Sequence, residues 1–396
     1  MSTQALDINR VFYQQLLDRL STFAPLIQII SGPRQVGKTT AIKSFLKTLP
    51  VNATYLSLDN PGPSPHEFIR FEWERAIKAI GHKVIVFDEV QNISNWASLI
   101  KELYDEERPK KETNLVILGS SSVDLLLNGE ASLLGRFEII KAPHWSLFEM
   151  NKAFGWDLNT FLKFGGYPIL GNLLNEGEES YERCQNFVRD AILEPVITRD
   201  IFSLQNVLNT ALFRQVLKIS LSVPCREISF TKIVGQLHQK GCSITIKSYL
   251  ELLEKAFLIK LLYRYSGGVI RKRTSTPKII PLAPALIHAF KDFTLIDSEP
   301  AWFGDVFESA VISRISETNF DLYYWSNSKQ NVDLVIEGSD FLCAVEIKST
   351  KEIDFTGLKA FKAEYPKAKI LMIDRIRGEE LLQSTDPKKL ILNWVM

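Results

Sequence analysis

One stretch decides the fold of this chain: Ser31-Gly32-Pro33-Arg34-Gln35-Val36-Gly37-Lys38-Thr39-Thr40. It stands between an apolar run, residues 26–30, and a segment with helical character, residues 41–49. Two glycines at this spacing, followed by Lys-Thr between a strand and a helix, are typical of loops that wrap backbone N–H groups around nucleotide phosphates. We therefore predict that the residues from Gly32 to Thr40 form an ATP-binding loop.

Each residue type in this loop has a chemical reason to be there. Glycines let the backbone approach the phosphates closely, and Lys38 supplies a positive charge to the outer phosphates. The Thr39 hydroxyl is suited to a Mg²⁺ ligand, and the start of the following helix adds a positive dipole end. A glycine-rich turn that binds nothing is the alternative, but it would not require the flanking strand and helix.

Two carboxylates end a second apolar run, residues 83–89. Asp88 is predicted to hold Mg²⁺ together with Thr39, while Glu89 orients and activates the attacking water. The alternative is that the pair only caps a strand at the surface. With the phosphate loop upstream, the catalytic interpretation is favoured.

Strand-like and helix-like segments alternate through the first third of the chain. Strands are expected at residues 26–30, 53–59, 83–89 and 115–122, and helices at 1–20, 65–80 and 96–107. This alternation indicates a parallel sheet with helices on both faces and with ligands at the carboxyl ends of its strands.

Two further positions are candidates for sensing or stabilising the γ-phosphate. Ser120 or Ser121, at the end of the fourth strand, could hydrogen-bond the phosphate or the water, or could only start a turn. Arg136 could stabilise charge during phosphoryl transfer, in the same chain or in a neighbour. The alternative for Arg136 is a surface position or a contact with a local carboxylate.

The composition is ordinary for a soluble globular protein. The chain has 396 residues, 45% of them hydrophobic and 23% charged, with a net charge of +1. No apolar run is long enough to span a membrane, and the first residues lack a signal peptide core, so a cytoplasmic protein without a membrane partner is expected. The four cysteines have no C-x-x-C spacing, which argues against a zinc site.

Residues 210–280 are strongly basic, with 13 Lys or Arg against 3 Asp or Glu. Within them, residues 230–240, a turn at 241–243, residues 245–256 and an apolar run at 257–262 follow the order of a winged helix. A winged helix presents its second helix to a nucleic-acid groove, so DNA is an expected partner. Many such domains contact only proteins, which is the alternative.

A second group of charged residues lies near the C-terminus. Glu346 and Lys348 are two apart in an apolar strand and should share a face, with Asp333 on the preceding strand and Glu308 on a helix. Such carboxylates could hold a second Mg²⁺ or Mn²⁺, and with Lys348 they could cleave a phosphodiester. This arrangement resembles PD-(D/E)xK nuclease-like folds. The alternative is a Glu346–Lys348 pair at a strand edge with Asp333 in a turn.

Several motifs together resemble a prokaryotic family of AAA-type ATPases that carry a C-terminal domain of unknown function. They are GPRQVGKT at 32–39, FDEVQ at 87–91, GSSS at 119–122, LGR at 134–136, GGYP at 165–168 and VEIKS at 345–349. The resemblance implies an AAA+ core, a winged helix and a nuclease-like domain. The chain departs from it at residues 278–284, where relatives tend to carry an aspartate after the strand.

The predicted fold class is therefore α/β, with a P-loop AAA+-type ATPase core followed by a helical winged-helix segment and a restriction-endonuclease-like α/β domain. The predicted domains are residues 1–150 (ATPase core), 151–209 (helical linker or lid), 210–280 (basic winged helix) and 281–396 (nuclease-like). The predicted function is a Mg²⁺-dependent ATPase that engages DNA. The alternative is a nucleotide-dependent switch that binds a protein partner through an inactive C-terminal scaffold. The sequence leaves the oligomeric state open.

Overall fold

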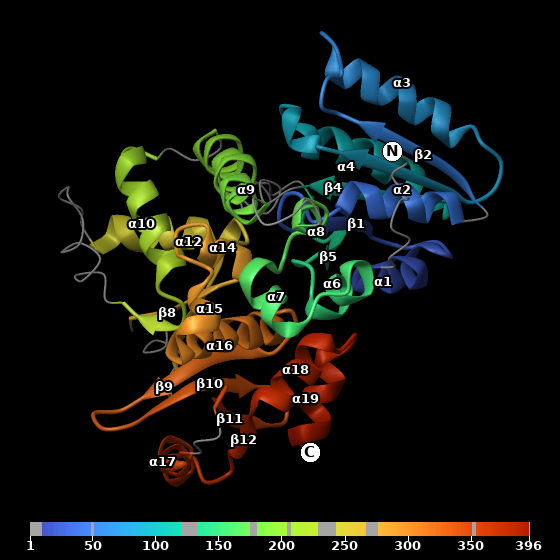
Figure 1. Cartoon of the computed structure of the whole chain (residues 1–396). Coiled ribbons are helices and arrows are strands. Elements are labelled where there is room, and N and C mark those ends of the chain that lie inside the picture. Colours follow the sequence, from blue (N-terminus) through green and yellow to red (C-terminus); the bar gives the residue numbers. More distant parts are fainter. Residues whose placement is uncertain are drawn as a thin grey trace. The chain divides into compact units, whose positions relative to one another are not determined.

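The computed structural model describes residues 10–48, 51–119, 133–174, 180–203, 207–228, 243–266, 276–350 and 354–395. The chain divides into two compact units, Met1–Pro143 with Pro195–Asn206, and His144–Glu194 with Val207–Met396. In Figure 1 the first unit is mainly blue and teal, and the second runs from green to red. Among the helices described, none has the length and apolar character needed to cross a bilayer.

A five-stranded parallel sheet in the order β2-β3-β4-β1-β5 forms the centre of the first unit. Its strands are β1 (Ile27–Ser31), β2 (Asn52–Ser57), β3 (Lys83–Asp88), β4 (Thr113–Gly119) and β5 (Phe137–Lys141). The other elements are α1 (Val11–Leu20), α2 (Lys38–Thr48), α3 (Pro65–Ile77), η1 (Val90–Asn92), α4 (Trp96–Glu107), η2 (Arg108–Lys110) and η5 (Val196–Phe202). Every residue of β1, β3 and β4 is buried, as expected for strands covered on both faces.

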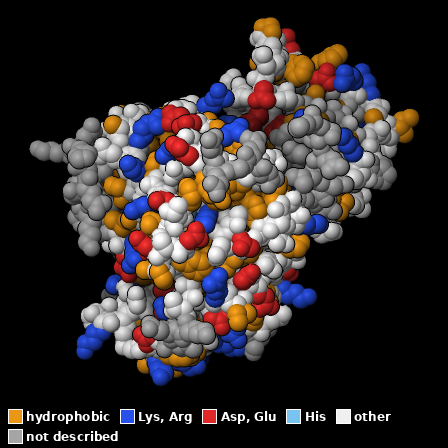
Figure 2. All heavy atoms as spheres, in the orientation of Figure 1, with side chains coloured by type: hydrophobic (Ala, Val, Ile, Leu, Met, Phe, Trp, Pro, Cys, Tyr) orange, Lys and Arg blue, Asp and Glu red, His pale blue; other side chains and the backbone are white. Residues whose placement is uncertain are grey.

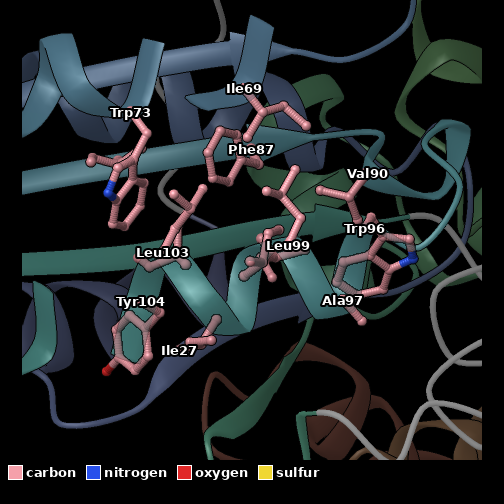
Figure 3. Close-up of a cluster of buried hydrophobic side chains, with 14 of the residues drawn as sticks. Ile27, Ile69, Trp73, Phe87, Val90, Trp96, Ala97, Leu99, Leu103 and Tyr104 are labelled. Atoms are coloured by element: carbon pink, nitrogen blue, oxygen red, sulfur yellow. The ribbon is translucent and has the colours of Figure 1, made fainter. Parts of the chain in front are cut away.

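Helices cover both faces of this sheet because neighbouring strand residues point in opposite directions. On one face, Ile85 and Phe87 of β3 pack in a cluster with Trp73 of α3 and Tyr104 of α4. Figure 3 shows this cluster, with the Trp73 ring beside that of Phe87. On the other face, the alternate β3 residues pack against α1 and α2, in a cluster that contains Val84, Val86, Phe12, Leu16 and Phe45. The predicted parallel sheet with two covered faces is confirmed.

Strand register brings the carboxyl ends of the strands to one edge of the sheet. Ser57 pairs with Asp88, Asp88 with Leu118, and Ser31 with Gly119. The loop that follows β1 and the carboxylates that end β3 therefore lie at the same edge, where ligands bind in parallel α/β sheets. Helix α2 begins at Lys38, three residues before the predicted start, because the loop passes directly into its first turn.

The second unit contains many helices around one mixed sheet. Its helices are α6 (Leu147–Phe154), α7 (Leu158–Phe164), α8 (Pro168–Leu174), α9 (Ser180–Phe187), η4 (Val188–Leu193), α10 (Thr210–Ser222), α12 (Ser243–Lys255), α14 (Pro284–His288), α15 (Leu295–Ser298), α16 (Pro300–Ser316), α17 (Thr356–Glu364), α18 (Arg375–Gln383) and α19 (Pro387–Val395). Helix α6 begins with a capping box in which Ser146 and Glu149 satisfy each other's backbone N–H groups.

The sheet of the second unit has seven strands in the order β12-β11-β10-β9-β7-β8-β6. They are β6 (Arg226–Glu227), β7 (Ile259–Arg264), β8 (Lys278–Pro281), β9 (Asp321–Ser326), β10 (Asn331–Glu337), β11 (Leu342–Ile347) and β12 (Lys369–Ile373). β7 pairs with β8 in antiparallel fashion and with β9 in parallel fashion. Strands of the segment predicted as a winged helix thus share one sheet with strands of the segment predicted as nuclease-like.

The winged helix and the nuclease-like domain of the second unit stay predictions. The first helix of the predicted winged helix, residues 230–240, lies outside the described residues, whereas the second corresponds to α12. The helix expected at Glu308 is α16, and the strands expected at Asp333 and Glu346 are β10 and β11. Both strands belong to a mixed sheet, which does not confirm the nuclease-like assignment.

Candidate functional site

The loop between β1 and α2 has the backbone geometry that its glycines allow. Gly37 has a φ of +86°, in the left-handed region, and a Cβ at this position would meet nothing within 4 Å. Gly32 is needed for another reason, since a Cβ there would come 2.0 Å from the carbonyl oxygen of Ala142. Gly37 thus turns the loop into α2, and Gly32 holds it against the chain that follows β5.

Lys38 is the first residue of α2, and its side chain folds over the loop. Its Nζ donates to the carbonyl oxygens of Gly32 at 2.9 Å and Pro33 at 2.7 Å. Burial lowers the pKa of Lys38 to about 8. The ammonium is therefore held at the loop by weak acceptors, which an anion such as phosphate would outcompete.

Thr39 and Asp88 meet between α2 and β3. Thr39 Oγ1 donates to Asp88 Oδ2 at 2.8 Å, and the Tyr55 hydroxyl of β2 donates to the same oxygen at 2.5 Å. A hydroxyl and a carboxylate in contact are a donor pair that suits Mg²⁺, which prefers few carboxylates and several waters. The structure thus brings Thr39 and Asp88 into contact, and their role as Mg²⁺ ligands stays a prediction.

Glu89 follows β3 in a backbone conformation uncommon for glutamate, with a φ of +59°. Its carboxylate accepts a hydrogen bond from the side-chain amide of Gln91. Burial and the neighbouring Asp88 raise the pKa of Glu89 above its ordinary value. This left-handed residue turns the chain, and the two neighbouring carboxylates have different partners: Thr39 and Tyr55 donate to Asp88, and Gln91 donates to Glu89.

Arg34 in the loop is bound by a carboxylate from a distant part of the sequence. Its Nε lies 2.8 Å from Asp200 Oδ2, and its Nη2 lies 2.5 Å from Asp200 Oδ1. Asp200 belongs to η5, and its side chain is 1% exposed. This bidentate pair joins the phosphate loop to η5 within the first unit.

A polar cleft of about 570 Å³ adjoins the loop. It is lined by Arg34 and Glu89 and, from η5, by Arg199 and Asp200. Charged side chains of both signs therefore line the space next to the carboxylate predicted to activate water.

Of the remaining γ-phosphate candidates, the structure describes only Arg136. Ser120 and Ser121 lie outside the described residues. Arg136 instead binds Asp105 of α4, with its Nε 2.8 Å from Oδ1 and its Nη2 3.0 Å from Oδ2. This is the local carboxylate contact named above as the alternative, and a part for Arg136 in hydrolysis stays a prediction.

The charged residues near the C-terminus do come together in the second unit. Lys348 Nζ lies 2.7 Å from Glu346 Oε1 and 3.8 Å from Asp333 Oδ2, and Asp333 Oδ2 also accepts the N–H of Ile347 at 2.9 Å. Burial and the nearby Asp333 raise the pKa of Glu346. Across the described ranges, no group of three or more His, Cys, Asp or Glu side chains is arranged to hold a metal ion.

Lys278, on β8, completes this group. Its Nζ lies 2.7 Å from Glu308 Oε1, 3.3 Å from the backbone oxygen of Asp333 and 3.8 Å from Asp333 Oδ1. Burial alone would lower the pKa of Lys278, but the carboxylates of Glu308 and Asp333 outweigh it and the pKa rises. Burial also raises the pKa of Glu308, to about 7.

Sequence reasoning missed Tyr55, Asp200 and Lys278. Lys278 had a usable signal, because a lysine within an apolar strand is costly unless it is paired. Tyr55 had a weak one, as a hydroxyl-bearing residue near the end of the strand next to β3. Asp200 had none, since its partner is 166 positions away.

Three family models match successive parts of the chain. Residues 25–151 match an AAA domain. The phosphate loop, Asp88 and Glu89 all lie within this AAA domain, which confirms the predicted P-loop core. Residues 155–296 and 303–385 match two domains of unknown function, DUF8612 and DUF4143.

Relatives that match most of the chain have low sequence identity to it. The chain is 24% identical over 335 residues to an uncharacterized protein of Mycobacterium tuberculosis, covering 83% of this chain and 71% of that protein. It is 26% identical over 282 residues to an uncharacterized protein of Methanocaldococcus jannaschii, covering 65% of this chain and 59% of that one. Among solved structures, the Walker-type ATPase of Pyrococcus abyssi is similar with a TM-score of 0.49 at 14% identity, covering 72% of this chain and 95% of that chain.

Proposed function

We propose that the first unit binds ATP with Mg²⁺ and hydrolyses it, and that hydrolysis controls engagement of DNA by the second unit. The observation that carries the first part is the contact between Thr39 Oγ1 and Asp88 Oδ2 beside Lys38 at the start of α2. Three groups of different chemistry, an ammonium, a hydroxyl and a carboxylate, thus lie at the edge of the sheet where parallel α/β folds bind ligands.

The roles follow from the chemistry of each group. Lys38 exchanges its two carbonyl acceptors for the outer phosphates of ATP, and the backbone from Gly32 to Thr40 surrounds them. Glu89, whose pKa is raised, accepts a proton from the attacking water. Thr39 and Asp88 would hold Mg²⁺, which would supply positive charge to the phosphates when bound. Tyr55 keeps the Asp88 carboxylate in place.

DNA engagement is proposed from the charge of residues 210–280. In the described part of this segment, several cations already meet carboxylates: Arg214 binds Glu194, Arg226 binds Asp305, Lys260 binds Glu254 and Lys278 binds Glu308. On the face drawn in Figure 2, Lys and Arg side chains are interspersed with Asp and Glu. The DNA proposal rests most on the run Arg271-Lys272-Arg273, which lies outside the described residues and has no acidic neighbour in the sequence.

A salt titration tests the DNA proposal. Phosphate contacts predict that log Kd rises linearly with log salt concentration, and replacing Arg271, Lys272 and Arg273 by alanine should reduce that slope by about 2 to 3. The matched control replaces Lys110 and Lys111, a basic pair outside the segment, and should leave the slope unchanged. No binding of single-stranded, duplex or branched DNA at low salt would contradict the proposal.

The same samples test ATP hydrolysis. Phosphate release is measured with Mg²⁺ and with each form of DNA, while the DNA is examined for cleavage. If hydrolysis occurs and no DNA changes its rate, the alternative function, a nucleotide-dependent switch with a protein partner and an inactive C-terminal scaffold, is favoured. The ion pair between Lys278 and Glu308 supports the scaffold part of that alternative.

A further inference from the structure

The carboxylates of Glu308, Asp333 and Glu346 were predicted to hold a divalent metal, and their surroundings test that prediction. Each comes from a different element: Glu308 from α16, Asp333 from β10 and Glu346 from β11. Side chains of Asp333 and Glu346 are each 10% exposed, and that of Glu308 is 16% exposed. Three carboxylates so poorly solvated need positive charge close by.

Two lysines supply that charge from opposite sides of Asp333. Lys278 contacts Glu308 at 2.7 Å and lies 3.8 Å from Asp333 Oδ1, and Lys348 contacts Glu346 at 2.7 Å and lies 3.8 Å from Asp333 Oδ2. The side chain of Lys278 is 9% exposed, so its ammonium belongs to the interior of the cluster rather than to solvent. Further hydrogen bonds go to protein groups, from Ile347 N–H to Asp333 Oδ2 and from Lys278 Nζ to the Asp333 backbone oxygen.

This arrangement does not fit a metal site. A divalent ion needs several oxygen ligands directed at one point, whereas here a lysine ammonium lies between Glu308 and Asp333. A Mg²⁺ or Mn²⁺ ion in the same place would face the positive charge of Lys278 at close range. Lys278 could leave only by placing an unpaired ammonium in a buried position, which is costly.

We propose that Lys278 is the resident cation of this carboxylate cluster, so that the site takes no divalent metal and the second unit does not cut nucleic acid. The cluster then ties α16, β8, β10 and β11 together as a structural ion network.

The experiment uses the full chain without nucleotide and follows Mn²⁺ binding by the EPR signal of free Mn²⁺. Wild type and Glu346→Gln are expected to bind the same amount of Mn²⁺, because neither holds it at the cluster. Wild type should also leave supercoiled DNA uncut with Mn²⁺. Mn²⁺ binding, or DNA nicking, that is present in wild type and lost in Glu346→Gln would overturn the proposal.

A second variant tests the part played by the lysine. Lys278→Met leaves the carboxylates without their cation, so it should lower the Tm, gain Mn²⁺ binding, and regain Tm when Mn²⁺ is added. Lys278→Arg is the control that keeps the charge and should gain no Mn²⁺ binding. A folded Lys278→Met that binds no more Mn²⁺ than wild type would contradict the proposal, and if this variant does not fold, the comparison of wild type with Glu346→Gln decides.

Discussion

Arg34 and Asp200 form a bidentate ion pair between the phosphate loop and η5, with Nε–Oδ2 and Nη2–Oδ1 distances of 2.8 Å and 2.5 Å. The two residues are 166 positions apart in the sequence, yet both lie in the first unit. η5 follows the segment His144–Glu194 of the second unit along the chain. The conformation of the phosphate loop is therefore physically linked to that of η5.

Removing one side of this pair should destabilise the first unit. Asp200→Asn takes a charged partner from Arg34 in a poorly solvated place, and breaking such a pair costs about 3 kcal/mol. Thermal unfolding measures the loss, with the exposed carboxylate Asp59 as control in Asp59→Asn. The double variant Arg34→Ala with Asp200→Asn should lose less free energy of unfolding than the sum of the losses in the two single variants. Equal stability of Asp200→Asn and Asp59→Asn would show that the pair contributes little.

Glu89→Gln should separate ATP binding from hydrolysis. The amide keeps the size of the side chain but cannot accept a proton from water, so turnover should fall by about 100-fold or more while ATP affinity is retained. Steady-state phosphate release and calorimetric titration measure the two quantities. Asp59→Asn, which removes another carboxylate from the same cleft, should keep normal turnover. If Glu89→Gln hydrolyses ATP at the wild-type rate, Glu89 is not the base.

Tyr55→Phe should raise the Mg²⁺ requirement of the ATPase. The Tyr55 hydroxyl donates to Asp88 Oδ2, and loss of a group that orients a metal ligand weakens metal affinity by about tenfold or more. The measurement is the Mg²⁺ concentration for half-maximal turnover at saturating ATP. Tyr13→Phe is the matched control, because that hydroxyl contacts Thr48 and no ligand of the site. An unchanged Mg²⁺ requirement in Tyr55→Phe would contradict this role.

His288 should make the second unit sensitive to acid. Burial lowers the pKa of His288 to about 4, and its neutral ring accepts the N–H of Trp302 at 3.2 Å and contacts the Lys163 carbonyl oxygen at 3.0 Å. Below about pH 6.5, the ordinary pKa of histidine, His288 binds a proton in the unfolded chain but stays neutral in the folded unit. Stability is therefore lost as the pH falls from about 6.5 to 4, by about 1.4 kcal/mol per pH unit.

Thermal unfolding across this pH range tests the His288 prediction. His288→Gln should show a flatter pH dependence than wild type, even if it is less stable at pH 7. His66→Gln, which changes a partly buried histidine of the first unit, should follow the wild-type curve for the second unit. Parallel curves for wild type and His288→Gln would mean that another group causes the acid sensitivity.

The parts of the fold that sequence could predict are those with local causes. The glycine loop, the apolar strands and the Asp88-Glu89 pair each leave a pattern within about ten residues, and all were placed correctly. Partners brought together by tertiary pairing had no such pattern. Asp200 meets Arg34 only because η5 returns to the first unit, and Lys278 meets Glu308 only because β8 lies against α16.

Strand pairing was the other property beyond the reach of the sequence. Residues 257–262 have an apolar pattern that suits a wing as well as a central strand. The parallel contact of Tyr263 with Tyr323 places β7 in the interior of a seven-stranded sheet. Such a contact depends on the register of strands far apart in the chain, and no single stretch encodes it.

The proposed function depends on binding of ATP at the loop between β1 and α2. Calorimetric titration of the full chain with ATP and Mg²⁺ tests it most directly, using Lys38→Ala and, as control, Lys47→Ala, which removes an exposed lysine from the same helix. Saturable binding is expected in wild type and in Lys47→Ala, and loss of binding in Lys38→Ala. Absence of binding in wild type, or equal binding in Lys38→Ala, would contradict it.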